Sequence, residues 1–406
     1  MLSVKTPNEV MEIICKNFGH IVGDEYAELT NALGRVLSED VISTEYVPGF
    51  NRSSVDGYAV LASDTFGCSE SIPAILRMMG YVQMGQSAEL ALSTGFCIDV
   101  PTGGEVAQGA DSVVMVEYTE DYRDGTIGVL KPTSPGNNII FKGDDVKPGG
   151  IVLRVGKTIT SHDIGALAAL GTTSVKVRKK PTIGIISTGD ELIDAGLTPK
   201  GGQIRDVNTY LLSAAVTSSG GEAKTYGIIN DEDEALEAAF DKALQECDMV
   251  LISGGSSVGL KDATARIIQG RGEILLHGIA MKPGKPTILG KAKGKPVFGL
   301  PGHPVAAYIV TQIFVVQVID ILTGRNSVAA NAVCAQITEE VSSNHGRAEY
   351  IAVRLRQSDG VMYAEPVRGK SGLITGLTGT DGYICIPRDK EGVRRGADVN
   401  VTLWRV

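Results

Sequence analysis

Apolar positions recur at helical spacing near the start of the chain. Residues 6–9, Thr-Pro-Asn-Glu, form a capping box with proline at the first helical position, and apolar residues follow at helical intervals as far as Phe18. This pattern predicts a helix from Pro7 to about His20. We expect a second short helix over residues 26–37.

Between residues 41 and 180 the pattern changes to short apolar runs separated by turn signals. Pro-Gly and Asp-Gly dipeptides and a Thr-Gly-Gly tripeptide recur in this stretch. Such a texture is typical of β structure. One short helix is expected over residues 161–170, with Ser161 as its cap.

From Pro181 onward, strand-like runs alternate with helical periodicity. Strands are expected at residues 182–187, 224–229, 249–253 and 297–300, and helices at residues 208–219, 231–243, 264–269 and 304–322. This alternation predicts a central three-layer α/β/α domain with a parallel, doubly wound sheet. After Asn326 short strands and turns return, which indicates a small C-terminal β domain.

The composition excludes several classes of protein. The chain has 38 Lys and Arg against 47 Asp and Glu, a net charge of −9, which argues against a general nucleic-acid binder. The six cysteines form no CxxC pair, and residues 1–10 lack an apolar signal core. The apolar stretch 304–322 carries Gln312, Gln317 and Asp320, which would be costly in a bilayer, so we expect a buried helix. A cytoplasmic protein without a membrane span is therefore predicted.

Candidate chemistry gathers where the predicted strands end, and ligands of open α/β sheets bind beyond the carboxyl ends of the strands. In chain order these ends carry Asp190-Glu191, Asn230-Asp231, the run Gly254-Gly255-Ser256-Ser257 followed by Asp262, and Pro301-Gly302-His303-Pro304. Glycine lets a phosphate approach backbone N–H groups, and a helix N-terminus favours an anion. Because Mg²⁺ is typically held by one or two carboxylates plus substrate phosphates, the pattern predicts a pocket for a phosphorylated ligand with Mg²⁺.

Each of these segments also has a purely structural explanation. Asp231 alone would be a helix N-cap, Gly254-Gly255 a tight turn, and His303 a surface residue. Glu191 has no obvious packing role directly after an apolar strand. The turn at residues 282–286, Lys-Pro-Gly-Lys-Pro, either holds two cations toward an anion or is a solvated loop. The interpretation as a site depends on all four strand ends meeting at one edge.

Taken together, the motifs resemble the molybdopterin molybdenumtransferase family, the bacterial and archaeal relatives of the C-terminal part of gephyrin. The resemblance spans nearly the whole chain. The matching stretches are Asp-Gly-Tyr-Ala at 56–59, the Thr102 turn leading to Gly109-Ala110-Asp111, residues 186–192, residues 202–208, Ser253-Gly254-Gly255, residues 282–286 and residues 300–305.

The resemblance implies a transferase of molybdenum-cofactor biosynthesis. Such an enzyme inserts molybdate into adenylated molybdopterin, with Mg²⁺ assisting the release of AMP. The resemblance also implies a homodimer whose site lies between the sheet domain of one subunit and a β domain of the other. A molybdopterin adenylyltransferase is the expected partner, since it makes the adenylated substrate.

Carried over onto this sequence, the resemblance implies a set of site residues. The catalytic residues would be Asp56, Glu191, Asp231 and Asp262, with Mg²⁺ on Asp190, Glu191 and Asp231. The substrate would contact Thr102, Ser187, Thr188, Gly189, Asp190, Ser253, Gly254, Gly255, Ser257, Lys282, Lys285, Pro301, His303, Pro304, Arg347 and Ser371. The chain departs from the family at Leu260-Lys261, where an acidic residue is usual, so the surroundings of Asp262 are less acidic.

The resemblance also gives the expected domains, with the sheet domain of the molybdopterin-binding type. They are an elongated connecting domain of residues 1–46 and 140–178, a β-rich domain of residues 47–139, the α/β domain of residues 179–325, and the C-terminal β domain of residues 326–406. Two other functions are open. An adenylyltransferase shares the sheet fold but needs only one domain. A non-catalytic pterin-binding scaffold would not need the acidic set.

Overall fold

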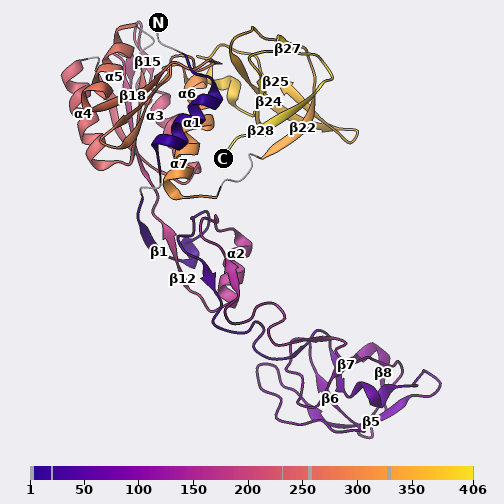
Figure 1. Cartoon of the computed structure of the whole chain (residues 1–406). Coiled ribbons are helices and arrows are strands. Elements are labelled where there is room, and N and C mark those ends of the chain that lie inside the picture. The colour runs from indigo at the N-terminus through magenta and orange to yellow at the C-terminus, as the bar shows by residue number, and fades with distance from the viewer. Residues whose placement is uncertain (1–3, 20–21, 231, 255–257, 327–330, 406) are drawn as a thin grey trace. The chain divides into compact units, whose positions relative to one another are not determined.

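The computed structural model of the chain forms two compact units (Figure 1). It describes residues 4–19, 22–230, 232–254, 258–326 and 331–405, with the backbone alone for residues 258–262. The larger unit comprises Met1–Glu39, Gly156–Thr160 and Ser174–Val406, and the smaller unit comprises Asp40–Val155 and Ser161–Thr173. The division of the chain into four domains stays a prediction.

The smaller unit is mostly β structure. Its elements are β2 (Val41–Ile42), β3 (Arg52–Ser53), β4 (Gly57–Val60), η2 (Ala62–Thr65), β5 (Ala74–Tyr81), β6 (Phe96–Val100), β7 (Ser112–Met115), η3 (Val116–Tyr118), β8 (Thr119–Asp121), β9 (Thr126–Val129), β10 (Ile139–Ile140), β11 (Ile151–Leu153) and α2 (Ser161–Ala169). The main sheet has the order β7-β4-β6-β5-β9-β8. Neighbouring residues of β4 such as Ala59 and Val60 belong to separate apolar clusters, so both faces of this sheet are covered.

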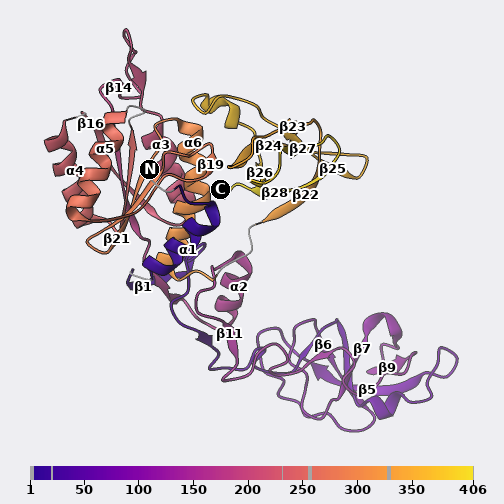
Figure 2. The ribbon, with the colours of Figure 1, turned by 45° about the horizontal axis from the view of Figure 1, so that its top comes forward.

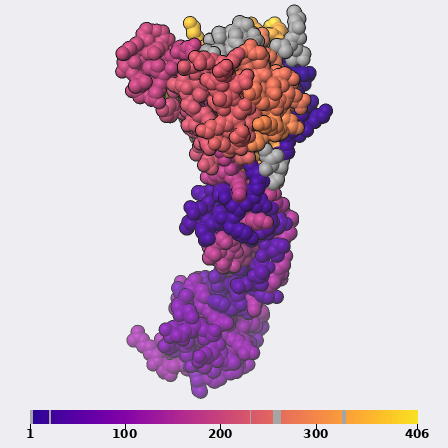
Figure 3. All heavy atoms as spheres, turned by 90° about the vertical axis from the view of Figure 1, so that its left-hand side faces the viewer, coloured from indigo at the N-terminus to yellow at the C-terminus, as the bar shows by residue number. Residues whose placement is uncertain are grey.

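The larger unit contains an α/β part and a barrel. The elements that precede and form the α/β part are α1 (Pro7–Asn17), β1 (Asp24–Glu28), η1 (Leu29–Asn31), β12 (Ser174–Arg178), β13 (Thr182–Thr188), β14 (Leu192–Ile193), β15 (Ile204–Arg205), α3 (Asn208–Ser218), β16 (Glu222–Ile229), α4 (Asp233–Glu246), β17 (Met249–Gly254), α5 (Val258–Arg271), β18 (Gly272–His277), β19 (Met281–Lys282), β20 (Ile288–Ala292), β21 (Lys295–Leu300), α6 (Pro304–Val310), the π-helical turn η4 (Thr311–Val315) and α7 (Val316–Thr323). The strand pair β14–β15 and its loop protrude from this part (Figures 2 and 3).

The sheet of the α/β part is mixed, so the prediction of a wholly parallel sheet is wrong. Its order is β16-β13-β17-β21-β20-β18, and the first four strands run parallel. Strand β20 runs antiparallel to both β21 and β18. The cause is a hairpin in which Ala292 pairs with Lys295. Its two loop residues, Lys293 and Gly294, have φ of 48° and 81°, the backbone that two-residue hairpins prefer.

Both faces of this sheet are covered by helices. Ile183 and Leu251 belong to one apolar cluster with residues of α1, α3, α6 and α7. Ile186 and Ile252 belong to a second cluster with residues of α4 and α5. Figure 1 shows the two sets of helices on opposite sides of the strands. Because side chains alternate along a strand, the buried strands are apolar almost throughout.

The start of the chain agrees with the sequence only in part. The capping box is present, with the Thr6 side chain accepting from the Glu9 N–H, and helix α1 ends at Asn17. The second helix expected over residues 26–37 is wrong. Strand β1 occupies its start and pairs with β12, and Gly34 with φ of 75° turns the chain where that helix would continue.

The barrel is built from the remaining elements. They are β22 (Ala332–Ile337), β23 (Val341–Ser342), β24 (Ala348–Ser358), β25 (Val361–Pro366), η5 (Ile374–Leu377), β26 (Gly382–Ile386), β27 (Gly392–Val393) and β28 (Asp398–Leu403). The order β24-β25-β22-β28-β26 closes through a pairing of β24 with β26. Strand β19 extends this sheet by pairing in parallel with Ala348–Glu349. The α/β part is thereby joined to the barrel.

The apolar run from Pro304 to Thr323 is a core helix. Among the described residues it is the one helix long and apolar enough to cross a membrane, and 67% of its most apolar window is buried within the protein. Its side chains pack in the same cluster as β13, β17 and β21. The buried helix expected from the sequence is confirmed.

The β20–β21 hairpin gives a stability prediction with a built-in control. Gly294→Ala places a Cβ at a left-handed position and should lower the free energy of unfolding by about 1 kcal/mol. Gly270→Ala, at an exposed position in α5 where a Cβ meets nothing, should raise it by roughly 0.5–1 kcal/mol. Urea unfolding followed by circular dichroism measures both. Shifts of the same sign would contradict the assigned turn.

Candidate functional site

The carboxyl ends of the parallel strands lie at one edge of the sheet. Thr188 at the end of β13 pairs with Gly254 at the end of β17. Ser253 pairs with Leu300 at the end of β21. The chain therefore leaves all three strands at the same edge, and the segments beginning at Gly189 and Pro301 start there together.

Asn208 links two of these strand ends. It is the first residue of α3, and its Nδ2 donates to Ser253 Oγ at 2.7 Å and to the Gly302 carbonyl at 2.9 Å. The amide orientation is fixed by the carbonyl, which can only accept. In the sequence Asn208 is the expected start of a helix and the end of a matching stretch, and it was not predicted as a site residue. Its position at a helix start, opposite a strand end, was the available signal.

A buried carboxylate organises the same edge. Asp206 is 4% exposed and accepts from Ser187 Oγ at 3.2 Å and from Thr209 Oγ1 at 2.6 Å. The predicted contact residue Ser187 is thus tied to the helix start rather than turned outward. Asp206 was also missed as a functional residue, since an Asp before a helix reads equally well as a cap.

The glycines at this edge are explained first by packing. A Cβ on Gly254 would lie 2.1 Å from the carbonyl oxygen of Thr188, so only glycine fits between these strands. A Cβ on Gly189 would lie 2.8 Å from Glu191 Oε2, which places that carboxylate directly beside the turn. Asp190 and Glu191 are both exposed. The edge thus presents two adjacent acidic side chains to solvent.

The structure does not describe the side chains of some predicted site residues. Asp231, Gly255 and Ser257 lie outside the described residues, and Asp262 is described by its backbone in α5 alone. Among the residues that the structure does describe, no group of three or more His, Cys, Asp or Glu side chains is placed to hold a metal ion.

In the smaller unit two predicted residues meet. The antiparallel pairing of Gly57 with Val100 brings Asp56 beside Thr102, and the Thr102 N–H donates to Asp56 Oδ1 at 2.7 Å. This hydrogen bond holds the pKa of Asp56 below its usual range. Partial burial, with a smaller contribution from the charge of Asp56, raises the pKa of nearby Asp99. Asp56 therefore stays ionised to lower pH than an ordinary aspartate.

A cavity of about 810 Å³ lies between the α/β part and the barrel. Its walls come from the turn after β19, from α6, and from β24 and the segment 367–377. The cavity brings together six of the predicted residues: Lys282, Lys285, Pro301, His303, Arg347 and Ser371. It does not include the predicted residues Ser187, Thr188, Gly189, Asp190, Glu191, Ser253, Gly254 and Pro304.

The charge around this cavity is strongly positive. Among the described residues, five cationic side chains and one carboxylate line it: Lys282, Lys285, Arg347, Arg368, Lys370 and Glu349. Charges of one sign in a confined space with low-dielectric walls attract and hold ligands of the opposite sign. We call it the basic pocket. Its size and charge suit a small anionic molecule.

Two contacts hold the walls of the basic pocket. Lys282 Nζ lies 2.7 Å from Glu349 Oε1, and Ser343 Oγ donates to the other carboxylate oxygen at 2.7 Å. His303 Nδ1 lies 2.8 Å from Ser371 Oγ. Lys282 and His303 of the α/β part thus each have a partner in the barrel. Glu349 was missed in the sequence, where a single acid in an alternating strand carries no signal.

Comparisons with known proteins bear on all parts of the chain. Residues 5–171 match the MoeA N-terminal region (domains I and II), residues 184–320 match a probable molybdopterin binding domain, and residues 335–404 match the MoeA C-terminal region (domain IV). The chain is 34% identical to a putative molybdopterin biosynthesis protein of Methanocaldococcus jannaschii, over 93% of this chain and 92% of that protein. It is 30% identical to the molybdopterin molybdenumtransferase of Bacillus subtilis, over 100% of this chain and 96% of that protein.

The chain belongs to the molybdopterin molybdenumtransferase family. The family resemblance carried by the motifs is thereby confirmed. A crystal structure of a molybdopterin biosynthesis MoeA protein from Pyrococcus horikoshii superposes with a TM-score of 0.87 at 33% identity, covering 99% of this chain and 100% of that one. The multidomain fold is therefore that of the family. The basic pocket draws its walls from two of the matched regions, residues 184–320 and 335–404.

The Asp56–Thr102 contact gives a pH prediction. The pKa of Asp56 is lower in the folded than in the unfolded protein, so its hydrogen bond to Thr102 raises the free energy of unfolding at pH values above the unfolded pKa. This contribution disappears as the pH falls through the folded pKa. NMR titration of the carboxyl carbons should give Asp56 a midpoint below, and Asp99 a midpoint above, that of an ordinary aspartate. Asp56→Asn should lower the Asp99 midpoint. Two equal midpoints would contradict the geometry.

Proposed function

We propose that this protein inserts molybdate into adenylated molybdopterin and releases AMP. As a member of its family, the protein is a transferase of molybdenum-cofactor biosynthesis, so that part of the sequence-based prediction is confirmed. The family match does not include the role of Mg²⁺ or the release of AMP. They rest on the chemistry of the pocket and of the sheet edge.

The observation that carries the proposal is the charge of the basic pocket. Molybdate is a dianion, and charge-assisted hydrogen bonds from lysine and arginine are the strong contacts for such a ligand. Lys285 and Arg347 are the cationic lining residues for which we propose direct contact. Lys282 would contribute while keeping Glu349 neutralised. Carboxylates alone, as at the sheet edge, would repel the same anion.

The sheet edge is proposed to hold the phosphate end of the pterin substrate. Oxygen ligands are those that Mg²⁺ prefers, and Asp190 and Glu191 supply two exposed carboxylates beside the strand ends, so the donor set fits this ion. Asp231, the third residue proposed for Mg²⁺, lies outside the described residues. When bound there, Mg²⁺ would neutralise charge on the phosphoryl oxygens.

The remaining predicted residues are given positioning roles in this proposal. Asp56, held by the Thr102 N–H, would orient water or the pterin in its ionised form. Asp262 would act with it. His303 and Ser371 would keep the rim of the basic pocket in place through their mutual hydrogen bond. Thr188 and Ser253 would shape the edge against which the pterin lies.

The assembly and setting of the protein are part of the same proposal. We propose a cytoplasmic homodimer that receives its substrate from a molybdopterin adenylyltransferase, because an adenylated pterin must be made before it can be consumed. The adenylyltransferase reading of this chain is weakened by the matched N- and C-terminal regions, which add to the sheet domain. Competition between molybdate and tungstate for turnover would separate the two oxyanions.

The charge argument predicts opposite effects at two pocket residues. Lys285→Met removes a cation and should weaken molybdate binding roughly tenfold, in line with one hydrogen bond to a charged group. Glu349→Gln keeps the shape, removes the pocket's carboxylate and should tighten binding. Titration calorimetry with molybdate at two salt concentrations measures both, and the difference should shrink at high salt. If both variants bind molybdate with the affinity of the wild type, the basic pocket is not the oxyanion site.

The proposed role of Glu191 is tested separately from the pocket. Glu191→Gln keeps the side-chain shape and removes one charge from the sheet edge. Binding of adenylated pterin should persist, while AMP release falls about a hundredfold or more, as expected when a group that serves the reaction is lost. A single-turnover assay with Mg²⁺ and molybdate measures this. Unchanged AMP release would make Glu191 an ordinary surface residue.

A further inference from the structure

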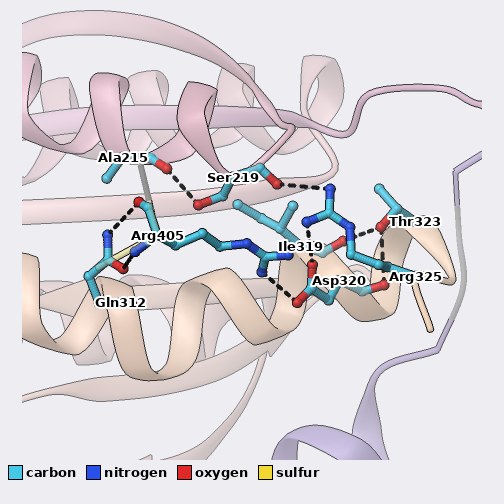
Figure 4. Close-up of polar contacts among 8 residues, drawn as sticks. All are labelled: Ala215, Ser219, Gln312, Ile319, Asp320, Thr323, Arg325 and Arg405. Atoms are coloured by element: carbon cyan, nitrogen blue, oxygen red, sulfur yellow. Dashed lines mark hydrogen bonds and ion pairs between the residues drawn. The ribbon is translucent and has the colours of Figure 1, made fainter. Parts of the chain in front are cut away.

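The segment Trp404–Arg405, which follows β28 of the barrel, is fastened to the core helix of the α/β part. The side chain of Gln312 accepts from the Arg405 backbone N–H at 3.2 Å and donates to its carbonyl at 3.5 Å. Arg405 Nη1 lies 2.6 Å from Asp320 Oδ2. Figure 4 shows these contacts along one side of the helix. The backbone and the side chain of Arg405 are therefore both held.

The π-helical turn explains how Gln312 and Asp320 come to face the same way. Residues eight apart in a regular helix point roughly 80° apart, at about 100° per residue. One extra residue in a π turn removes about one such step, leaving them nearly aligned. The turn η4, Thr311–Val315, contains Gln312 and ends before Asp320, which lies in α7. Gln312 and Asp320, two of the polar residues that interrupt this apolar stretch, thus serve one contact.

Trp404 extends the contact toward the basic pocket. The centroid of its ring lies 5.2 Å from the ring centroid of Tyr308 on α6 and 5.1 Å from that of Tyr383 on β26. Its Nε1 donates a hydrogen bond to Thr380 Oγ1 at 2.9 Å. The ring centroid of Tyr383 in turn lies 5.8 Å from that of Tyr350, which lines the pocket. An aromatic chain therefore connects the helix, the segment and the pocket wall.

We propose that Trp404–Arg405 is a positioning element that keeps the two walls of the basic pocket at binding distance. The inference rests on the proposed function of that pocket. Its cations are divided between the two parts, with Lys285 on one wall and Arg347 on the other. The pairing of β19 with β24, the Lys282–Glu349 ion pair and the His303–Ser371 hydrogen bond join the walls beside the pocket itself. The Trp404–Arg405 contact joins them at the core helix as well, so an anion meets both sets of cations at once.

Asp320 offers a matched pair of arginines for the test. Arg405 reaches Asp320 from the barrel. Arg325 follows α7 in the α/β part, to which Asp320 also belongs, and its Nη1 lies 3.2 Å from Asp320 Oδ1. Arg405→Met removes an ion pair between the two walls. Arg325→Met removes an ion pair to the same carboxylate within one wall. A merely stabilising role predicts similar consequences for both.

The experiment uses the full chain, molybdate alone as the probe, and the emission of Trp404, the single tryptophan of the sequence. Arg405→Met should shift the emission to longer wavelength and weaken molybdate binding at least fivefold. Arg325→Met should leave both near the wild-type values, even where its urea midpoint falls more. In turnover, Arg405→Met should raise the KM for molybdate more than it lowers kcat. Gln312→Leu, which releases the Arg405 backbone, should behave like Arg405→Met.

Reciprocity adds a result that a structural role does not produce. If closing the walls favours the anion, the anion must favour closing the walls by the same factor. Saturating molybdate should therefore return the emission of Arg405→Met toward that of the wild type. Equal molybdate affinities in the two arginine variants, or an emission that molybdate does not change, would overturn the proposal. If the wild type does not bind molybdate, the proposed function of the pocket is wrong. The tryptophan emission then tests the contact by itself: a shift in Arg405→Met but not in Arg325→Met supports it, and equal emission in both contradicts it.

Discussion

Five of the cationic side chains that the structure describes surround one cavity and repel one another, and the fold has to hold them together before any ligand arrives. It does so with contacts that do not depend on a ligand. Lys282 is neutralised by Glu349, whose own side chain is only 13% exposed and is fixed by Ser343. A carboxylate at this position lowers the repulsion between the other cations and leaves a net attraction for an anion. The Lys282–Glu349 ion pair also joins the barrel to the α/β part, next to the pairing of β19 with β24.

In the proposed function, the sheet edge and the basic pocket divide the chemistry between them. The edge carries Asp190 and Glu191 beside strands packed so closely that Gly254 has room for no side chain. The pocket carries the positive charge. A substrate with a phosphate at one end and an oxyanion acceptor at the other needs both kinds of surface. The turn at residues 282–286 and the segment after Pro301 belong to the α/β part and also line the pocket, which places the two surfaces next to each other.

Local patterns in the sequence were enough to predict most elements of the α/β part. The capping box at Thr6 and the apolar runs of β13, β17 and β21 fix their elements through neighbours in the chain. Strand β20 was missed because its place depends on a two-residue turn whose backbone, not its apolar pattern, sets the direction. The helix expected over residues 26–37 failed because pairing with a distant strand outweighed local spacing.

The site was predicted less completely than the fold, for a related reason. Lys282 ends β19, Lys285 lies in the turn that follows, and His303 directly precedes α6; all three belong to short Pro-Gly motifs that are visible in the sequence. Glu349 and Arg368 belong to the barrel, and only the long-range closure of its strands brings them to the cavity. Asn208 and Asp206 read as helix-start residues, and their contacts to Ser253 and Ser187 appear only when the strand ends are aligned.

The most direct test of the account is the position of the oxyanion in a crystal of the protein soaked with molybdate, located by the anomalous scattering of molybdenum. The account predicts a peak in the basic pocket, within hydrogen-bonding reach of Lys285 and Arg347. A peak at the strand ends beside Gly189 and Gly254, with the basic pocket empty, would contradict it.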